Sequence, residues 1–215
     1  MRLHLPPSLR SALLASLVSF SGIYSYSHAA TSADFWQIPD FGGPDFTWTG
    51  AGEGDAVGTA GNWEGGSAPS RVDNKGPHLI FNGVDVTVTG TPPNTSDGGG
   101  ISVTGNGSVS VGLGQWGGNV YVEKGSSLTT SFGTQLKNME PEGHANIYVD
   151  GTLNMTTPGG NLNFDNGTGS GNHYWHIGLD GMVNLSNTTT ITKNAKTWNV
   201  EVVVASAMEE LSVTN

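Results

Sequence analysis

The sequence predicts an all-β protein and, within that class, a right-handed parallel β-solenoid in which short strands stack coil upon coil. Three observations lead to this prediction. Apolar residues alternate with polar ones in many short runs, as expected of strands that bury one face. One phrase of strand, glycine and strand, clearest at 147–155, recurs in related form at 101–111, 120–128 and 177–185. Glycine marks a similar corner in each phrase, at Gly107, Gly125, Gly151 and Gly181, with uneven spacings of 18, 26 and 30 residues.

A β-sandwich such as a jelly roll is the alternative architecture, because it also needs short strands with turn signals every ~8–12 residues. The ladders of similar aliphatic residues, with Asn, Ser, Thr and Gly at the expected corners, favour the solenoid. This packing predicts that Val122, Val149 and Leu179 face a common dry interior.

Residues 1–29 indicate a secretory signal peptide rather than a part of the fold. Arg2 and Arg10 give a basic start, and the apolar run that follows is too short to span a membrane in the ordinary way. Ser27 and Ala29 place small residues at a cleavage site. We therefore expect export after cleavage near Ala29, to the periplasm, the cell surface or the medium, and no integral membrane protein.

Residues 30–82 predict an irregular capping segment, rich in aromatic residues and glycine, that forms one structural domain with the β-repeat body at 83–215. Several of its residues fall in a distinctive order: Trp48, Gly50, Asn62, Trp63, Gly66, Pro69, Asp73 and Ile80-Phe81. This order resembles the opening of exported bacterial β-strand-repeat proteins, of the autotransporter-like or surface-sorted kind. The resemblance covers about residues 46–90 and implies a β-repeat fold and a surface address, and it is poorly specific for activity.

The body at 83–215 begins with valines at alternate positions from Val84 to Val88, with Asp85 on the opposite face. The stretch 91–100 contains two prolines and three consecutive glycines, so it predicts a loop, since proline cannot donate to a sheet ladder. After the repeat phrases, alternating apolar residues at 198–204 predict a further strand.

Composition limits the partners. The chain has 18 Asp and Glu against eight Lys and Arg, and cleavage would also remove Arg2 and Arg10, which leaves a net charge of about −12. A polyphosphate backbone requires clustered Lys and Arg, so we expect no nucleic-acid partner, and the charge disfavours anionic polysaccharides as well. Cysteine is absent. Burial and hydrogen-bond ladders must therefore hold the exported chain together without disulfides.

The densest candidate for ligand binding is the run formed by His173, Tyr174, Trp175 and His176, whose aromatic faces and hydrogen-bonding groups suit sugar rings. In a strand, His173 and Trp175 would share one face, and Tyr174 and His176 the other. This separation of the histidines, without a visible third ligand, leads us to expect no metal site and no cofactor. The alternative is a structural coil in which Trp175 covers the core.

Three carboxylates are weaker candidates for catalysis. Asp150 and Asp180 occupy equivalent positions before glycine and could form the carboxylate pair that a glycosidase places around the scissile bond. Because both directly precede glycine, the pattern favours turn residues over a catalytic pair. Asp165 lies in a turn that invites comparison with that of aspartic proteases, but Asn166 stands where a hydroxyl residue is expected. A second carboxylate would have to come from a dimer.

Together these observations predict a non-catalytic β-repeat module, secreted or displayed at a bacterial surface, with a structural or adhesive role toward glycans or a host or matrix surface. The first alternative is a carbohydrate-active enzyme, a glycoside hydrolase or lyase, on the same scaffold. A dimeric aspartic-type protease that uses Asp165 is less favoured. The identity of the ligand and the oligomeric state do not follow from the sequence.

Overall fold

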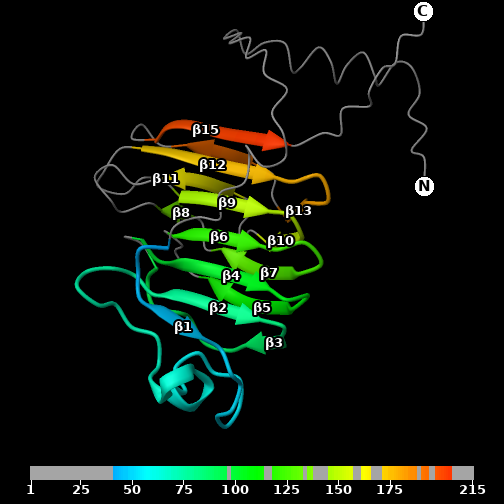
Figure 1. Ribbon diagram of the computed structural model, residues 1–215. Coiled ribbons are helices and arrows are strands. Elements are labelled where there is room, and N and C mark those ends of the chain that lie inside the picture. Colours follow the sequence, from blue (N-terminus) through cyan, green and yellow to red (C-terminus); the bar gives the residue numbers. More distant parts are fainter. Residues whose placement is uncertain are drawn as a thin grey trace, which may run out of the picture. The chain divides into compact units, whose positions relative to one another are not determined.

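The computed structural model is an all-β protein whose strand pairs are all parallel, which confirms the predicted parallel β-solenoid (Figure 1). The chain passes from one sheet to the next and then returns to the first, so strands that are adjacent in space are distant in sequence. The described residues belong to one compact unit. They are 41–95, 98–113, 118–132, 135–137, 145–156, 161–165, 171–187, 190–193 and 197–204.

Within the described residues the strands form three sheets. Sheet 1 contains β1 (Asp45–Thr47), β2 (His78–Asn82), β4 (Gly100–Thr104), β6 (Asn119–Val122), β9 (Ala145–Val149), β12 (Gly171–Ile177) and β15 (Thr197–Val204), in that spatial order. Sheet 2 contains β3 (Asp85–Val88), β5 (Ser108–Leu113), β7 (Ser127–Phe132), β10 (Thr152–Thr156) and β13 (Met182–Ser186). Sheet 3 contains β8 (Gln135–Lys137), β11 (Asn161–Asp165) and β14 (Thr190–Lys193). Two short 3-10 turns, η1 (Ala60–Asn62) and η2 (Glu64–Gly66), precede the body.

The core is built from the inward side chains of sheets 1 and 2, which recur at every second residue of each strand. In sheet 1 the register aligns two ladders, Leu79, Ile101, Val120, Ile147 and Trp175, and Phe81, Val103, Val122 and Val149. In sheet 2 it aligns Val109, Leu128 and Leu153, and Val111, Thr130 and Met155. Val122 and Val149 are fully buried, as predicted. Each such apolar side chain contributes about 1.5–3 kcal/mol when it leaves water.

Leu179 does not face the core, so the prediction for this residue is wrong: it is 55% exposed. The alternation stops at Ile177, where β12 ends, and the next residues form the corner that leads to β13. The N–H of Gly178 donates to the carbonyl oxygen of Val149 at 2.7 Å, and the N–H of Gly181 donates to that of Gly178 at 3.0 Å. The repeat phrase therefore identifies the two strands correctly but assigns a strand position to a turn residue.

An aromatic cluster covers the first coils. Trp48 and Trp63 form an isolated antiparallel bridge, and their rings meet edge to face with centroids 5.0 Å apart. Trp63 also contacts Phe81 of β2, at a centroid distance of 5.8 Å. Strand β1 pairs in register with β2, where Asp45 is the partner of His78, and β2 pairs in register with β4, so the ladder of sheet 1 includes strands of the residues expected to form the capping segment.

The corner between β9 and β10 brings backbones into close contact. A Cβ atom at Gly151 would lie 2.3 Å from the carbonyl oxygens of both Glu123 and Ser126, which belong to the preceding coil. The N–H of Gly151 donates to the carbonyl oxygen of Val122 at 3.1 Å, and the N–H of Thr152 donates to that of Ser126 at 2.9 Å. These hydrogen bonds between the corners of neighbouring coils fix the register of one coil against the next.

Candidate functional site

The outer face of sheet 2 carries a regular array of short polar side chains. Successive residues of a strand point to opposite faces, so the residues between the buried positions point to solvent. The register aligns one such residue from each strand in a row that we call the polar column: Thr87, Ser110, Thr129, Asn154 and Asn184. Because adjacent strands lie about 4.8 Å apart, the polar column presents one hydrogen-bonding side chain per step of that length.

A groove of about 270 Å³ lies on this face. It is lined by Asp85, Val86, Thr87, Ser108, Val109, Ser110 and Thr129. Three of these residues come from β3, three from β5 and one from β7, so the groove spans three neighbouring strands. The Oδ1 atom of Asp85 accepts a hydrogen bond from the backbone N–H of Ser108 at 2.9 Å, which fixes the carboxylate at the wall of the groove.

Side-chain hydrogen bonds order the other half of the polar column. The Nδ2 atom of Asn184 donates to Oδ1 of Asn154 at 2.8 Å, and Nδ2 of Asn154 donates to Oγ1 of Thr129 at 3.3 Å. In the neighbouring row, the hydroxyl oxygens of Thr156 and Ser186 are 2.9 Å apart. These contacts hold the side chains in defined orientations, and such preorganisation reduces the entropy lost when a partner binds.

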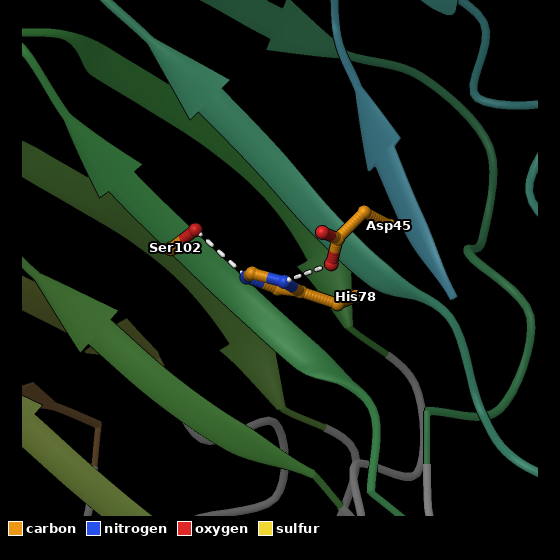
Figure 2. A network of polar contacts seen from close by, with 3 residues as sticks. All are labelled: Asp45, His78 and Ser102. Carbon is orange, nitrogen blue, oxygen red and sulfur yellow. Dashed lines mark hydrogen bonds and ion pairs between the residues drawn. The ribbon is translucent and has the colours of Figure 1, made fainter. Parts of the chain in front are cut away.

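A second polar arrangement joins three neighbouring strands of sheet 1. Figure 2 shows the imidazole of His78, on β2, between Asp45 of β1 and Ser102 of β4. The distance from Asp45 Oδ1 to His78 Nδ1 is 2.8 Å, and that from His78 Nε2 to Ser102 Oγ is 2.9 Å. With Asp45 ionised and the imidazole neutral, Nδ1 carries the proton and Nε2 accepts from the serine hydroxyl. The same order of groups activates the nucleophile of serine hydrolases.

The surroundings of the Asp45–His78–Ser102 chain suit a structural link better than a nucleophile. Ser102 is 6% exposed and His78 is 8% exposed. The ring of Phe41 stacks on the imidazole, with centroids 3.7 Å apart and an interplanar angle of 1°. Strand β4 pairs with β2 on one edge and β6 on the other, so its backbone N–H groups belong to the sheet and leave no oxyanion hole beside Ser102. The chain of hydrogen bonds therefore fastens β1 to the body.

We expect His78 to make stability depend on pH. Burial lowers the pKa of His78 from its usual 6.5, and the hydrogen bond and charge of Asp45 oppose this shift only in part. Because the folded pKa lies below the unfolded one, the unfolded chain binds more protons between the two values. The contribution of His78 is therefore complete above pH 6.5 and is lost as the pH falls through the lowered folded pKa.

Urea unfolding of the wild type and of His78→Gln across this pH range measures the effect. We expect the unfolding free energy of the wild type to fall more steeply below pH 6.5 than that of the variant. Parallel pH profiles for the two proteins would contradict the assignment to His78.

Asp150 and Asp180 lie at equivalent corners, as their places in the repeat phrase suggest, since each precedes by two residues the paired Thr152 and Met182. The Nζ atom of Lys124 lies 2.5 Å from Oδ2 of Asp180. The hydrogen bond and charge of Asp180, with a smaller effect of Asp150, raise the pKa of this lysine. Asp180 therefore forms an exposed ion pair with Lys124. In a glycosidase, both carboxylates of the catalytic pair face the bond to be cleaved.

Strand β12 places the residues of the predicted aromatic site on different faces of sheet 1. Trp175 is 5% exposed and belongs to the core, with Ile147 and Val202 as its register neighbours. His176 lies on the outer face, where its ring stacks on Tyr148 with centroids 4.6 Å apart and an angle of 5°. Each of these two rings covers one face of the other in this stack. This segment therefore contributes packing on both sides of the sheet.

For three further candidate site residues, the structure describes the backbone only. His173 and Tyr174 belong to β12, and Asp165 is the last residue of β11, where it is in register with Lys137. The side chains of these candidates lie outside the described part of the chain.

Sequence reasoning missed both polar arrangements. Asp45, His78 and Ser102 are separated by 33 and 24 residues, so only the strand register brings them together, and no local pattern reveals it. The polar column left a signal in the alternating hydroxyl and amide residues at 108–110, 127–131 and 152–156. In the sequence alone, this alternation indicates only the solvent face of strands.

Comparisons with known proteins assign neither a family nor a fold relative: no family model, no curated protein and no solved structure matches this chain. Within the described ranges, no group of three or more His, Cys, Asp or Glu side chains is arranged to hold a metal ion.

Proposed function

We propose that the protein is an exported, non-catalytic β-solenoid module, secreted or displayed at the cell surface, that adheres to neutral glycans through the groove and the polar column of sheet 2. The observation that carries this proposal is the groove itself, which crosses three strands and is lined by four hydroxyl side chains and one carboxylate. Serine and threonine hydroxyls both donate and accept hydrogen bonds, as the hydroxyls of a sugar do, so the two surfaces are chemically matched.

The charge supports a neutral partner. The residues lining the groove include one carboxylate, Asp85, and neither lysine nor arginine. The whole chain carries a formal net charge of −10, which repels polyanions at low salt. A neutral polysaccharide, or a neutral stretch of a host or matrix glycan, avoids this repulsion.

Export is supported by the leader-like composition of residues 1–29, which lie outside the described residues, and by the resemblance of residues 46–90 to exported repeat proteins. In the part of the chain that the structure describes, no helix has the length and apolar character needed to cross a membrane. An exported solenoid would present the polar column to the polysaccharides that surround a bacterial cell.

Substitution in the groove tests the proposal. Thr129→Val keeps the size and strand preference of the side chain but removes its hydroxyl, and we expect it to weaken glycan binding by about 2- to 12-fold, the effect of one hydrogen bond worth ~0.5–1.5 kcal/mol. Binding can be measured by depletion of the protein from solution onto insoluble neutral polysaccharides. The matched control is Thr47→Val on β1 of sheet 1, which should bind like the wild type.

Two results would overturn the proposal. One is the absence of binding to any neutral glycan on an array. The other is hydrolytic turnover of a polysaccharide that Asp150→Asn or Asp180→Asn abolishes while the fold is retained, which would favour a carbohydrate-active enzyme.

A further inference from the structure

We infer that the glycan bound by this face is an extended, unbranched, β-linked chain that lies along the polar column with one sugar on each strand. This inference rests on the proposed glycan-binding function and adds the direction, the linkage class and the length of the ligand. The first observation is that the strand register does not shift along the polar column. Each of its members is the direct Cα partner of the next.

The groove sets the direction of the ligand. It contains three residues from each of β3 and β5 and one, Thr129, from β7. Three residues along a strand span roughly 7 Å, whereas three neighbouring strands span about 10 Å, so the longer direction of the hollow runs across the strands. A chain that lies across the strands follows the hollow from Thr87 to Thr129 and then continues over Asn154 and Asn184.

The step of the column selects the linkage. Parallel strands repeat every ~4.8 Å, and a sugar in an extended β-1,4-linked chain advances by slightly more than this length. Neighbouring sugars are turned by about 180°, so each sugar can lie over one strand while every second sugar presents the same edge to the column. An α-1,4-linked chain curves away from a straight row, so it can contact only one or two members of the column at once.

The side chains of the polar column change from hydroxyls at one end to amides at the other, and this change should affect how affinity depends on the length of the ligand. The end at Thr87, Ser110 and Thr129 is hollowed and offers hydroxyls. The end at Asn154 and Asn184 offers amides that are already oriented by their mutual hydrogen bond of 2.8 Å. A chain of three sugars fills the hollowed end, and about five sugars are needed to reach Asn184.

The experiment uses the full chain and β-1,4-linked gluco-oligosaccharides of two to eight sugars, with α-1,4-linked oligosaccharides of the same lengths as the matched ligand control. Calorimetric titration gives each Kd. We expect the affinity of the β-linked series to rise about fivefold per added sugar, the effect of roughly one further net hydrogen bond, and to level off at about five sugars. The α-linked series should show no such rise.

A variant at the far end separates this inference from a general effect on the fold. Asn184→Ala should weaken binding of the five-sugar chain about fivefold and leave the three-sugar chain unchanged. Ser186→Ala, on the same strand but in the neighbouring row, is the control and should change neither.

The possible outcomes are distinct. Equal affinity for short and long chains, or for both linkages, would overturn this inference and leave the proposed glycan-binding function standing. No binding to any oligosaccharide or insoluble glycan would overturn both. Inhibition of ice recrystallisation without glycan binding would also overturn both, because it would identify an ordered water lattice as the partner of the array.

Discussion

Trp63→Ala is expected to lower the free energy of unfolding by about 3–5 kcal/mol, the usual loss when a large buried aromatic side chain is truncated. Trp63 is 2% exposed and packs edge to face against Trp48, with Phe81 at a centroid distance of 5.8 Å. Its indole Nε1 also donates to the carbonyl oxygen of Val57 at 2.8 Å. The substitution would therefore open a cavity between the loop and the first coil and leave a buried carbonyl without its donor.

Chemical unfolding of Trp63→Ala, followed by far-ultraviolet circular dichroism, measures this loss. Trp63→Phe is the informative companion, because it keeps an aromatic ring in the cluster but removes the indole N–H, and we expect a smaller loss of about 1–3 kcal/mol. Val72→Ala, at a position that is 47% exposed, should be close to the wild type. Equal stability of Trp63→Ala and Val72→Ala would show that the cluster does not hold the first coils.

Gly151→Ala is expected to destabilise the protein by about 3 kcal/mol or more, at or above the upper end of the range for overpacking. The added methyl would lie 2.3 Å from two backbone carbonyl oxygens, those of Glu123 and Ser126. Neither oxygen can rotate away as a flexible side chain would. The coil that contains β9 and β10 would have to separate from the coil that contains β6 and β7.

Gly112→Ala provides the matched control on sheet 2. A Cβ at Gly112 would have Ser131 Oγ at 3.6 Å as its nearest neighbour, an ordinary van der Waals contact. We expect this variant to lie within about 0.5 kcal/mol of the wild type. The comparison is made on urea midpoints for both variants, and a Gly151→Ala midpoint equal to that of Gly112→Ala would contradict the close packing of the corners.

The fold could be predicted because its cause is local. Alternation at residues such as Ile147 and Val149 depends only on neighbours in sequence, and a buried ladder amplifies it in every coil. The positions at which the strands end are harder to predict from the sequence. Leu179 looks like one more member of an alternating run, and only the hydrogen bond from Gly178 to Val149 shows that the strand has already ended.

The candidate site could be predicted only in part, because it depends on register. Alternation correctly separates Trp175 from His176, but it does not say which of the two enters the core. The polar column combines residues from five strands, and uneven loops between them hide the alignment of Thr129 with Asn154. A fixed repeat length would have revealed the column, whereas this chain varies its loops.

The parallel pairing of sheets 1 and 2 has a mechanical consequence. The ladder hydrogen bonds point along the stack of coils, from each strand to the next. A pull along the stack opens these bonds one strand pair at a time, as a zip opens. A pull along the strands loads all the bonds of a pair together in shear, so we expect the stack to resist a force along its strands better than a force along its axis.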